Sequence, residues 1–170
     1  MSVLAAKEVK MLERQLHELY GCTGVLDDCV VLKTGREEKI WIAPKSVFQI
    51  DMQRLRTQVL GLYFGRLDRG VLRLSIEGCQ IVGKTATRNV VEIEKQQLWD
   101  WLRGFDVPAG RKFDAHEGVY VLVRLDEDWL GMGKLVGEKL QNVLPKSRKL
   151  ISLTKEKQED LYVKADLVKI

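Results

Sequence analysis

Residues 78–85 match the G-x-x-x-x-G-K-[ST] pattern of phosphate-binding loops at every fixed position. In such a loop the backbone N–H groups surround phosphates, the lysine (here Lys84) binds the outer oxygens, and the hydroxyl residue (here Thr85) binds magnesium. The motif therefore raises the hypothesis of a small P-loop nucleotide-binding protein.

The sequence around this motif favours a different interpretation. A phosphate-binding loop follows a strand that is buried on both faces and opens a helix. Here residues 72–77 alternate apolar with polar types, and residues 86–93 run into β-branched strand formers. We therefore expect residues 78–88 to be a polar inter-domain linker in which Lys84 and Arg88 are simply basic.

No other group of residues has the spacing of a catalytic or metal site. Residues 126–128 are three adjacent carboxylates, which we interpret as a solvated turn because useful acid–base pairs need two different environments. The three cysteines and two histidines are irregularly spaced, without a C-x-x-C pair, so we expect buried free thiols and no metal. The expectation is a protein that is not an enzyme and has no cofactor.

The positive charge is concentrated in one short segment. The formal net charge of the whole chain is +4, and residues 134–149 alone contain five basic side chains against the single carboxylate of Glu138. Such a local surplus suits a phosphate backbone, although a solvated lysine-rich face would have the same composition. The basic residues of this segment are Lys134, Lys139, Lys146, Arg148 and Lys149.

Length and composition predict a folded protein of two small domains. The chain has 170 residues, of which 45% are hydrophobic and 31% charged. We expect an α+β domain at 1–83, a second domain at 84–155 and a C-terminal tail at 156–170. Without a signal-like start or a membrane-spanning apolar run, the expectation is a soluble, cytoplasmic protein with no membrane partner.

The elements of the first domain follow from hydrophobic spacing. Residues 7–20 have apolar residues at helical intervals, and Gly21 is a plausible residue to end this helix. Residues 62–67 and 71–77 form a predicted strand pair, in which the second strand alternates apolar and polar residues.

The second domain is predicted to be a small β-barrel with one helix. The helix covers 95–103, with Leu98 and Leu102 inward, and ends at Gly104. Residues 118–125 form a central strand because both of its faces are mostly apolar.

A two-residue turn at Gly137-Glu138 predicts a hairpin of residues 130–136 and 139–144. Its register opposes Val136 to Lys139, Leu135 to Leu140, and Lys134 to Gln141. Lys134, Lys139 and Gln141 then project from one outward face, so part of the basic segment becomes a sheet surface.

Four segments of the second domain resemble a known family in order and spacing. They are Leu-Arg-Gly at 102–104, the hydrophobic strand at 118–124, Leu-Gly-Met-Gly-Lys at 130–134 and Gln-Asn-Val-Leu-Pro-Lys at 141–146. Together they resemble the RNA-binding PUA-like region that ends bacterial ribosomal RNA cytosine-5 methyltransferases. The resemblance covers about residues 88–150, and Gln141 stands where that family usually has a lysine.

The two-domain layout also resembles that of archaeal and eukaryotic ribosome-biogenesis factors, in which a pre-PUA domain precedes PUA. Residues 61–66 and 72–76 resemble theirs more weakly. The methyltransferases owe their chemistry to a large domain that binds S-adenosylmethionine and has cysteines after Pro or Thr. Here the cysteines follow Gly21, Asp28 and Gly78, so the resemblance implies the RNA-binding part without the activity.

PUA-like domains bind structured RNA through the loop after their helix and a neighbouring sheet face. Carried over to this chain, the resemblance implies RNA binding by Arg103, Gly104, Arg111, Lys112, Lys134, Lys139, Lys146, Arg148 and Lys149. Phosphate contact would be their role. For Asn142 and Trp129 a structural role competes with base contact, and for Gly131 and Gly133 close approach to a strand competes with close approach to RNA.

The first hypothesis is therefore a non-catalytic RNA-binding protein of ribosomal RNA maturation or RNA modification. Its partners would be structured RNA (rRNA or tRNA) and an RNA methyltransferase or pre-ribosomal proteins. The alternatives are a protein–protein adaptor in ribosome biogenesis and the small P-loop protein.

Because residues 78–88 are expected to be a linker, we expect no micromolar binding of ATP or GTP in the presence of magnesium. Isothermal titration measures this directly. Micromolar affinity that is lost in Lys84→Ala would establish the phosphate-loop hypothesis instead.

Overall fold

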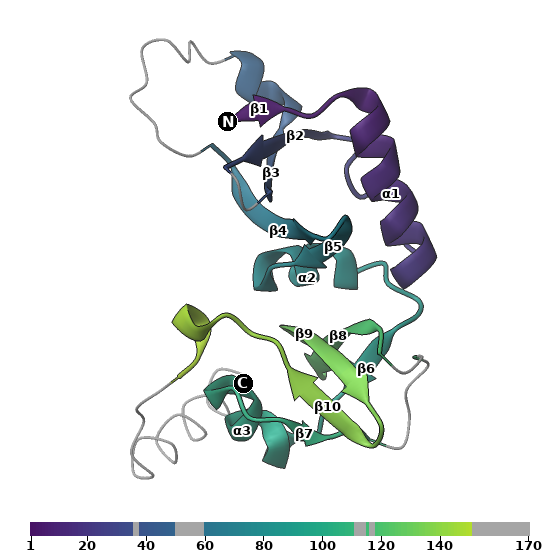
Figure 1. Ribbon diagram of the computed structural model, residues 1–170, viewed down its shortest axis with the longest axis vertical. Helices are drawn as coiled ribbons and strands as arrows, with labels where there is room; N and C mark the ends of the chain where they lie inside the picture. Colours follow the sequence, from purple (N-terminus) through teal and green to yellow (C-terminus); the bar gives the residue numbers. More distant parts are fainter. Residues whose placement is uncertain (36–37, 50–59, 111–114, 116–117, 151–170) are drawn as a thin grey trace, which may run out of the picture.

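Two five-stranded sheets stacked along the long axis of the molecule define its architecture (Figure 1). The structure, a computed structural model, describes all residues except 36–37, 50–59, 111–114, 116–117 and 151–170. We call the part built on the first sheet the N-terminal lobe and the part built on the second sheet the C-terminal lobe. Two sheets with a few helices make this an α+β fold. The tail at 156–170 lies outside the described residues.

Helix α1 (Ala6–Tyr20) covers one face of the first sheet (Figure 1), and the predicted helix at 7–20 is confirmed. Leu12, Leu16 and Tyr20 are fully buried at successive turns, since a spacing of four residues keeps side chains on one face. Gly21 ends the helix with φ of 74°, and its N–H donates to the carbonyl of His17.

The first sheet is an antiparallel meander in the order β1-β2-β3-β4-β5. Its strands are β1 (Ser2–Val3), β2 (Cys29–Thr34), β3 (Lys39–Pro44), β4 (Leu62–Asp68) and β5 (Val71–Leu74), with a short 3-10 helix η1 (Lys45–Gln49) after β3. Ile40, Phe64 and Leu72 form part of the main core with α1. A smaller cluster around Val30 and Ala43 lies apart from that core.

Residues 76–83 form helix α2 (Ile76–Gly83), so the expectation of a linker over 78–88 is wrong for this segment. The predicted strand at 71–77 correspondingly ends at Leu74. Ser75 caps the helix by accepting a hydrogen bond from the Gly78 N–H at 2.9 Å, a type of N-cap that proteins favour. Cys79 and Val82 are fully buried, which gives the helix its apolar face.

The same helix argues against a phosphate-binding loop. The residues that would wrap phosphates in an open loop are helical from Ile76 to Gly83. The Cys79 N–H bonds to the carbonyl of Ser75, and the Thr85 N–H bonds to the carbonyl of Val82. These donors are therefore used within the protein backbone.

The second sheet has the order β6-β8-β9-β10-β7, with β8 in the centre as predicted. Its elements are β6 (Val90–Glu92), η3 (Lys95–Gln97), α3 (Leu98–Arg103), β7 (Val107–Pro108), β8 (Tyr120–Leu125), β9 (Asp128–Val136), β10 (Lys139–Asn142) and η4 (Lys146–Arg148). All three residue pairs expected in the β9–β10 hairpin are present. Among the described strands β6 and β7 are the sheet edges, so the small β-barrel expected for this lobe has the form of a half-barrel sheet.

Helix α3 ends at Gly104 as predicted, but its inward residue differs from the expectation. Trp101 is fully buried, whereas Leu98 and Leu102 are only half-buried. A Cβ at Gly133 would come within 3.0 Å of the Trp101 ring. The glycine in β9 therefore makes room for the Trp101 indole, so this tryptophan of the helix takes the inner position.

The main core extends from the N-terminal lobe into the C-terminal lobe, which also has a separate cluster around Val91, Trp101 and Val121. Leu122 of β8 and Met132 of β9 belong to the cluster formed by α1, α2 and the first sheet. Helix α2 packs against both β4 and β9. The Leu74 N–H also donates to the Met132 sulfur at 3.0 Å across the junction. The lobes are thus fixed relative to each other by buried side chains and by the chain segment that joins them.

No helix in the described parts of the chain is long and apolar enough to cross a membrane.

Gly83 provides a test of the junction, because a Cβ there would lie 2.2 Å from the Trp129 ring. Gly→Ala within a helix usually stabilises by about 1 kcal/mol. Here we expect Gly83→Ala to lower the free energy of unfolding by about 1–3 kcal/mol, because the rigid indole must move. Urea denaturation followed by circular dichroism measures the change.

The control is Gln80→Ala on the exposed side of the same helix, which should stay within about 0.5 kcal/mol of the original protein. In a Trp129→Leu background the cost of Gly83→Ala should shrink, since the clash is gone. An equal cost in both backgrounds would contradict this packing.

Candidate functional site

The hairpin places Lys134 and Lys139 on one side of the second sheet, together with Gln141. That side is less open than the sequence suggested, because it also includes Leu122 and Met132, which pack against the N-terminal lobe. Lys139 is exposed at the end of the hairpin, whereas Lys134 is half-buried beside Tyr120. The expectation of a uniformly outward basic face is therefore corrected to a face whose inner part is covered.

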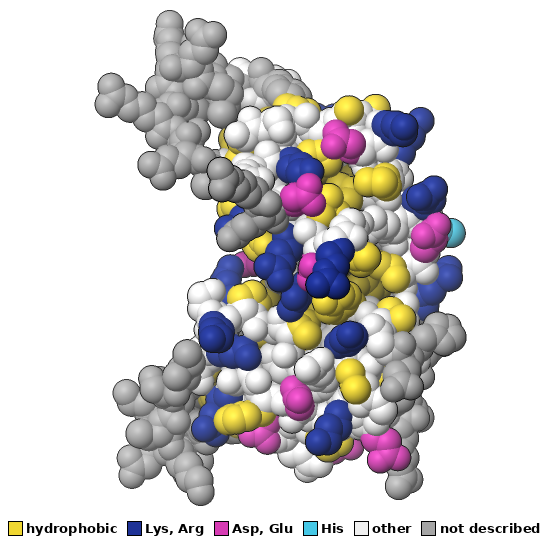
Figure 2. Space-filling view, in the orientation of Figure 1, with side chains coloured by type: hydrophobic (Ala, Val, Ile, Leu, Met, Phe, Trp, Pro, Cys, Tyr) yellow, Lys and Arg dark blue, Asp and Glu magenta, His cyan; other side chains and the backbone are white. Residues whose placement is uncertain are grey.

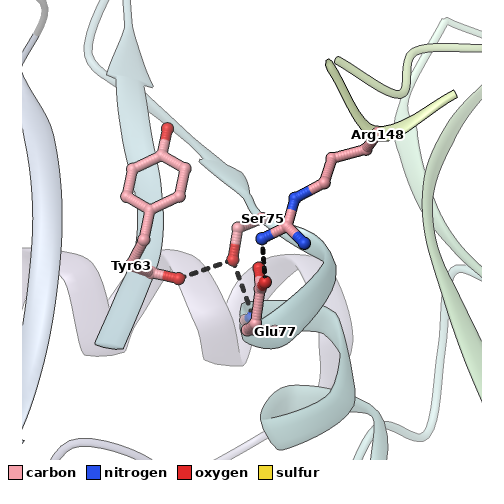
Figure 3. A network of polar contacts seen from close by, with 5 residues as sticks. Tyr63, Ser75, Glu77 and Arg148 are labelled. Atoms are coloured by element: carbon pink, nitrogen blue, oxygen red, sulfur yellow. Dashed lines mark hydrogen bonds and ion pairs between the residues drawn. The ribbon is translucent and has the colours of Figure 1, made fainter. Parts of the chain in front are cut away.

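The segment after β10 turns towards two different partners. Arg148 forms an ion pair with Glu77 of α2, as Figure 3 shows, and so connects the lobes. Lys149 extends to the end of α3, with its Nζ 3.4 Å from the carbonyl oxygen of Gly104. Lys146 is exposed at the start of η4.

Arg103 and Gly104 lie at the C-terminus of α3. The Arg103 guanidinium is 5.1 Å from the ring centroid of Phe105. The Lys149 side chain covers Gly104 so closely that a Cβ at Gly104 would lie 2.3 Å from the Lys149 Cδ atom. Arg103, Gly104 and Lys149 thus form one group, and Arg148 belongs to another. Arg111 and Lys112 lie outside the described residues.

The structure also shows a pocket of about 550 Å³ between the lobes, which sequence reasoning missed. It is lined by Lys39, Trp41, Tyr63, Arg66, Arg73, Leu74, Ser75, Val143, Leu144, Pro145, Ser147 and Arg148. Four of these side chains are cationic and none is a carboxylate. The N-terminal lobe supplies most of the charge and both aromatic rings.

Three of the cations come from one row across the first sheet. Lys39 of β3 is opposite Arg66 of β4, and Arg66 is opposite Arg73 of β5. Side chains that are opposite each other on neighbouring strands lie on the same face, so the row presents positive charge on the side away from α1.

An irregularity in β4 places the aromatic pair beside this row. Ile40 pairs with Gly65 and Trp41 with Tyr63, so Phe64 is an extra residue at a bulge. In a regular strand, Tyr63 and Arg66 would point to opposite faces, since they are three residues apart. The bulge brings both into the pocket, while Phe64 enters the core.

The two aromatic rings contact each other, with centroids 5.2 Å apart and planes at 51°. Trp41 is held in place because its indole N–H donates to the Thr34 hydroxyl at 3.0 Å. Both side chains are half-buried, so each keeps ring surface available in the pocket.

Arg73 joins the pocket to the second sheet. Its guanidinium donates to the Val143 carbonyl at 2.8 Å and lies 5.4 Å from the ring centroid of Tyr120. Tyr120 is opposite Lys134, so positive charge continues from one lobe to the other. Figure 2 shows Lys and Arg side chains gathered in the region where the two lobes meet.

Part of this surface was visible in the sequence. Lys39 and Trp41 alternate with Ile40 and Ile42, and Arg73 stands between two leucines, which is typical of the open face of a half-buried sheet. The pattern does not predict that these strands are neighbours or that the second lobe closes over them.

Several residues for which the sequence left both RNA contact and a structural role open have structural contacts. The side chain of Asn142 donates to the Trp101 carbonyl at 2.7 Å and accepts from the Leu144 N–H at 3.0 Å, so both of its ends are used. Trp129 packs on Gly83. Gly133 leaves space for a neighbouring side chain, Leu140, as does Gly131 for Leu144.

The cysteines do not provide a nucleophile. Burial raises the pKa of the Cys79 thiol far above its usual value and also raises the pKa values of Cys22 and Cys29, so all three stay protonated near neutral pH. Within the described ranges, no group of three or more His, Cys, Asp or Glu side chains is arranged to hold a metal ion.

Comparison with known proteins shows which family the C-terminal lobe is similar to. Residues 88–150 match the family model described as "Methyltransferase RsmF PUA domain". Three similar curated proteins are each named ribosomal RNA small subunit methyltransferase F. The one from Aeromonas salmonicida is 29% identical over 147 residues, the one from Aeromonas hydrophila 31% over 143, and the one from Vibrio cholerae 25% over 141.

These alignments cover 82–85% of this chain but only 28–29% of each relative. The chain therefore spans less than a third of the length of these methyltransferases. Because the alignments are much longer than residues 88–150, they also include much of the N-terminal lobe.

Proposed function

We propose that this chain, whose C-terminal lobe resembles the PUA-like C-terminal region of ribosomal RNA methyltransferases, is a non-catalytic RNA-binding protein that acts in ribosomal RNA maturation or modification. It binds structured RNA through the basic side of that lobe. Lys134, Lys139 and Lys146 contact phosphates there, and the group around Arg103 and Lys149 extends the contact.

The observation that supports this most is the positive charge on the lobe that matches the PUA model. Lysine and arginine contacts to phosphate fix the position and orientation of a nucleic acid without selecting its sequence. The β9–β10 hairpin supports Lys134 and Lys139 rigidly, because Leu135 and Leu140 beneath them are buried.

A role without catalysis is supported by what the residues can do chemically. The three thiols are protonated near neutral pH, and the segment that resembles a phosphate loop is a helix. The N-terminal lobe, in this proposal, acts like a pre-PUA domain that adds RNA surface.

The names of the relatives suggest which RNA to test first. They are methyltransferases of small-subunit ribosomal RNA by name, so fragments of that RNA are the first candidates and transfer RNA is the second. A methyltransferase or a pre-ribosomal protein is the expected protein partner.

The RNA-binding proposal predicts that removing the phosphate-contacting lysines makes RNA affinity less dependent on salt. Each lost phosphate contact should reduce the slope of log K against log salt by about 0.7–0.9. The triple variant Lys134→Ala/Lys139→Ala/Lys146→Ala should therefore bind a small-subunit rRNA hairpin more weakly, with a slope smaller by roughly 2–3. Fluorescence anisotropy over a salt series gives both quantities.

The matched control removes the same charge elsewhere. Lys7, Lys10 and Arg14 lie along the exposed face of α1, so their triple alanine variant should keep the slope nearly unchanged. If both triple variants behave alike, binding is unspecific attraction. If neither changes affinity and a methyltransferase is captured in the presence of nuclease, the chain is a protein adaptor.

A second prediction concerns catalysis. The chain incubated with S-adenosylmethionine carrying a labelled methyl group and with small-subunit rRNA should transfer no label, because no activated cysteine is available. Label in the RNA above a heat-denatured control would show that the chain is itself an enzyme.

A further inference from the structure

Arg66 of β4 and Arg73 of β5 lie directly opposite each other at the wall of the pocket. Like charges that are directly opposite on neighbouring strands destabilise a sheet, so an anion bound between them would lower this cost. Among the described residues that line the pocket there is no carboxylate, and Arg148 of the other lobe adds a further cation. Glu77 forms an ion pair with Arg148.

The aromatic pair supplies a second and different kind of contact. Trp41 and Tyr63 offer half-buried rings beside the cations, in a pocket of about 550 Å³. That volume lies within the range of small-ligand pockets, roughly 300–1,000 Å³. A ligand that fits must combine a flat aromatic group with negative charge a few ångströms away.

An unpaired nucleotide of RNA has both properties. In a duplex the bases are stacked on each other, so a protein cannot reach their faces, whereas an unpaired base can be turned outward and stacked on an aromatic side chain. The flanking phosphates would then lie along the row of cations, as in single-strand binding grooves. An acidic peptide would satisfy the cations but would leave the rings unused.

The pocket is built to keep its shape. Figure 3 shows how the Ser75 hydroxyl donates to the Tyr63 carbonyl and accepts from the backbone at Gly78, which fixes β4 to the start of α2. Arg73 is held by Val143 from the opposite lobe. Because the rings and cations are already in place, little ordering is needed when a ligand binds.

We infer that this inter-lobe pocket binds a single-stranded segment of RNA, with one unpaired base stacked on Trp41 and Tyr63 and its phosphates on Arg66 and Arg73. The inference rests on the proposed RNA-binding function. It adds a second site, which requires residues of both lobes. Paired RNA on the lysines of the β9–β10 hairpin and an unpaired segment in the pocket would together select a junction of helix and single strand.

The test compares two fluorescein-labelled probes by anisotropy. One is a single-stranded RNA of about six nucleotides, and the other is the same strand in a duplex. Tyr63→Leu removes the ring and Arg66→Ala removes one cation. The double variant should bind the single strand at least about tenfold more weakly, because stacking on one base alone contributes roughly 5- to 150-fold. Its affinity for the duplex should change by less than about twofold.

Tyr63→Phe is the matched control for packing. It keeps the ring and should retain the affinity of the original protein for the single strand, because stacking requires only the ring face. Arg14→Ala on α1 is the control for the loss of one charge and should leave both affinities unchanged. Thermal melts followed by circular dichroism establish that every variant is folded.

A crosslinking experiment adds a direct readout. A single strand that contains 4-thiouridine, irradiated in complex with the protein, should crosslink to the peptides that contain Trp41 and Tyr63. The mass spectrum of the digest identifies the site.

The outcomes separate the inference from the proposed function. If the pocket variant binds the single strand normally while the Lys134/Lys139/Lys146 variant loses the duplex, RNA binding stands and the pocket inference is wrong. The inference is also wrong if Tyr63→Phe is as weak as Tyr63→Leu, if both probes weaken equally, or if crosslinks lie elsewhere. If no variant changes the affinity for either probe, both the pocket inference and the proposed RNA-binding function are wrong.

Discussion

The contact of helix α2 with strand β9 is the constraint on which the rest of the structure depends. The helix is short, and small residues allow it to approach both lobes. A Cβ at Gly78 would lie 2.2 Å from the Phe64 carbonyl oxygen, and one at Gly83 would clash with Trp129. Leu122 and Met132 of the second sheet complete the same core. Two small lobes, each with limited burial of its own, thereby stabilise each other.

This shared core also determines which surfaces remain open. Helix α1 covers one face of the first sheet. On the other face, Trp41 packs against the small cluster that includes Val47, and the row of Lys39, Arg66 and Arg73 lies where the second lobe approaches. The second lobe reaches it with the chain after β10, at Val143 and Arg148, and leaves a pocket. Positive charge is therefore concentrated at the place where the lobes meet.

The proposed activities of the two surfaces are complementary. Exposed lysines on a hairpin give affinity that depends on salt and little selectivity, because every RNA has the same phosphates. Half-buried rings in a pocket of fixed shape accept only an unpaired base. A protein that used both would recognise where a helix ends in preference to a particular sequence. That property would suit the orientation of a larger RNA beside a modifying enzyme.

The sequence by itself determined the elements whose cause is local. Helix α1, the glycines that end it and α3, and the β9–β10 register follow from spacing and turn type, and each agrees with the structure. The resemblance of residues 88–150 was also visible in short segments. Only the tertiary structure decided that residues 76–83 are a helix, because their helical face is explained by burial between two lobes. Likewise, only the bulge at Phe64 brings Tyr63 and Arg66 to one face, and strand alternation predicts the opposite. A site made by two lobes depends on long-range packing, which no local pattern records.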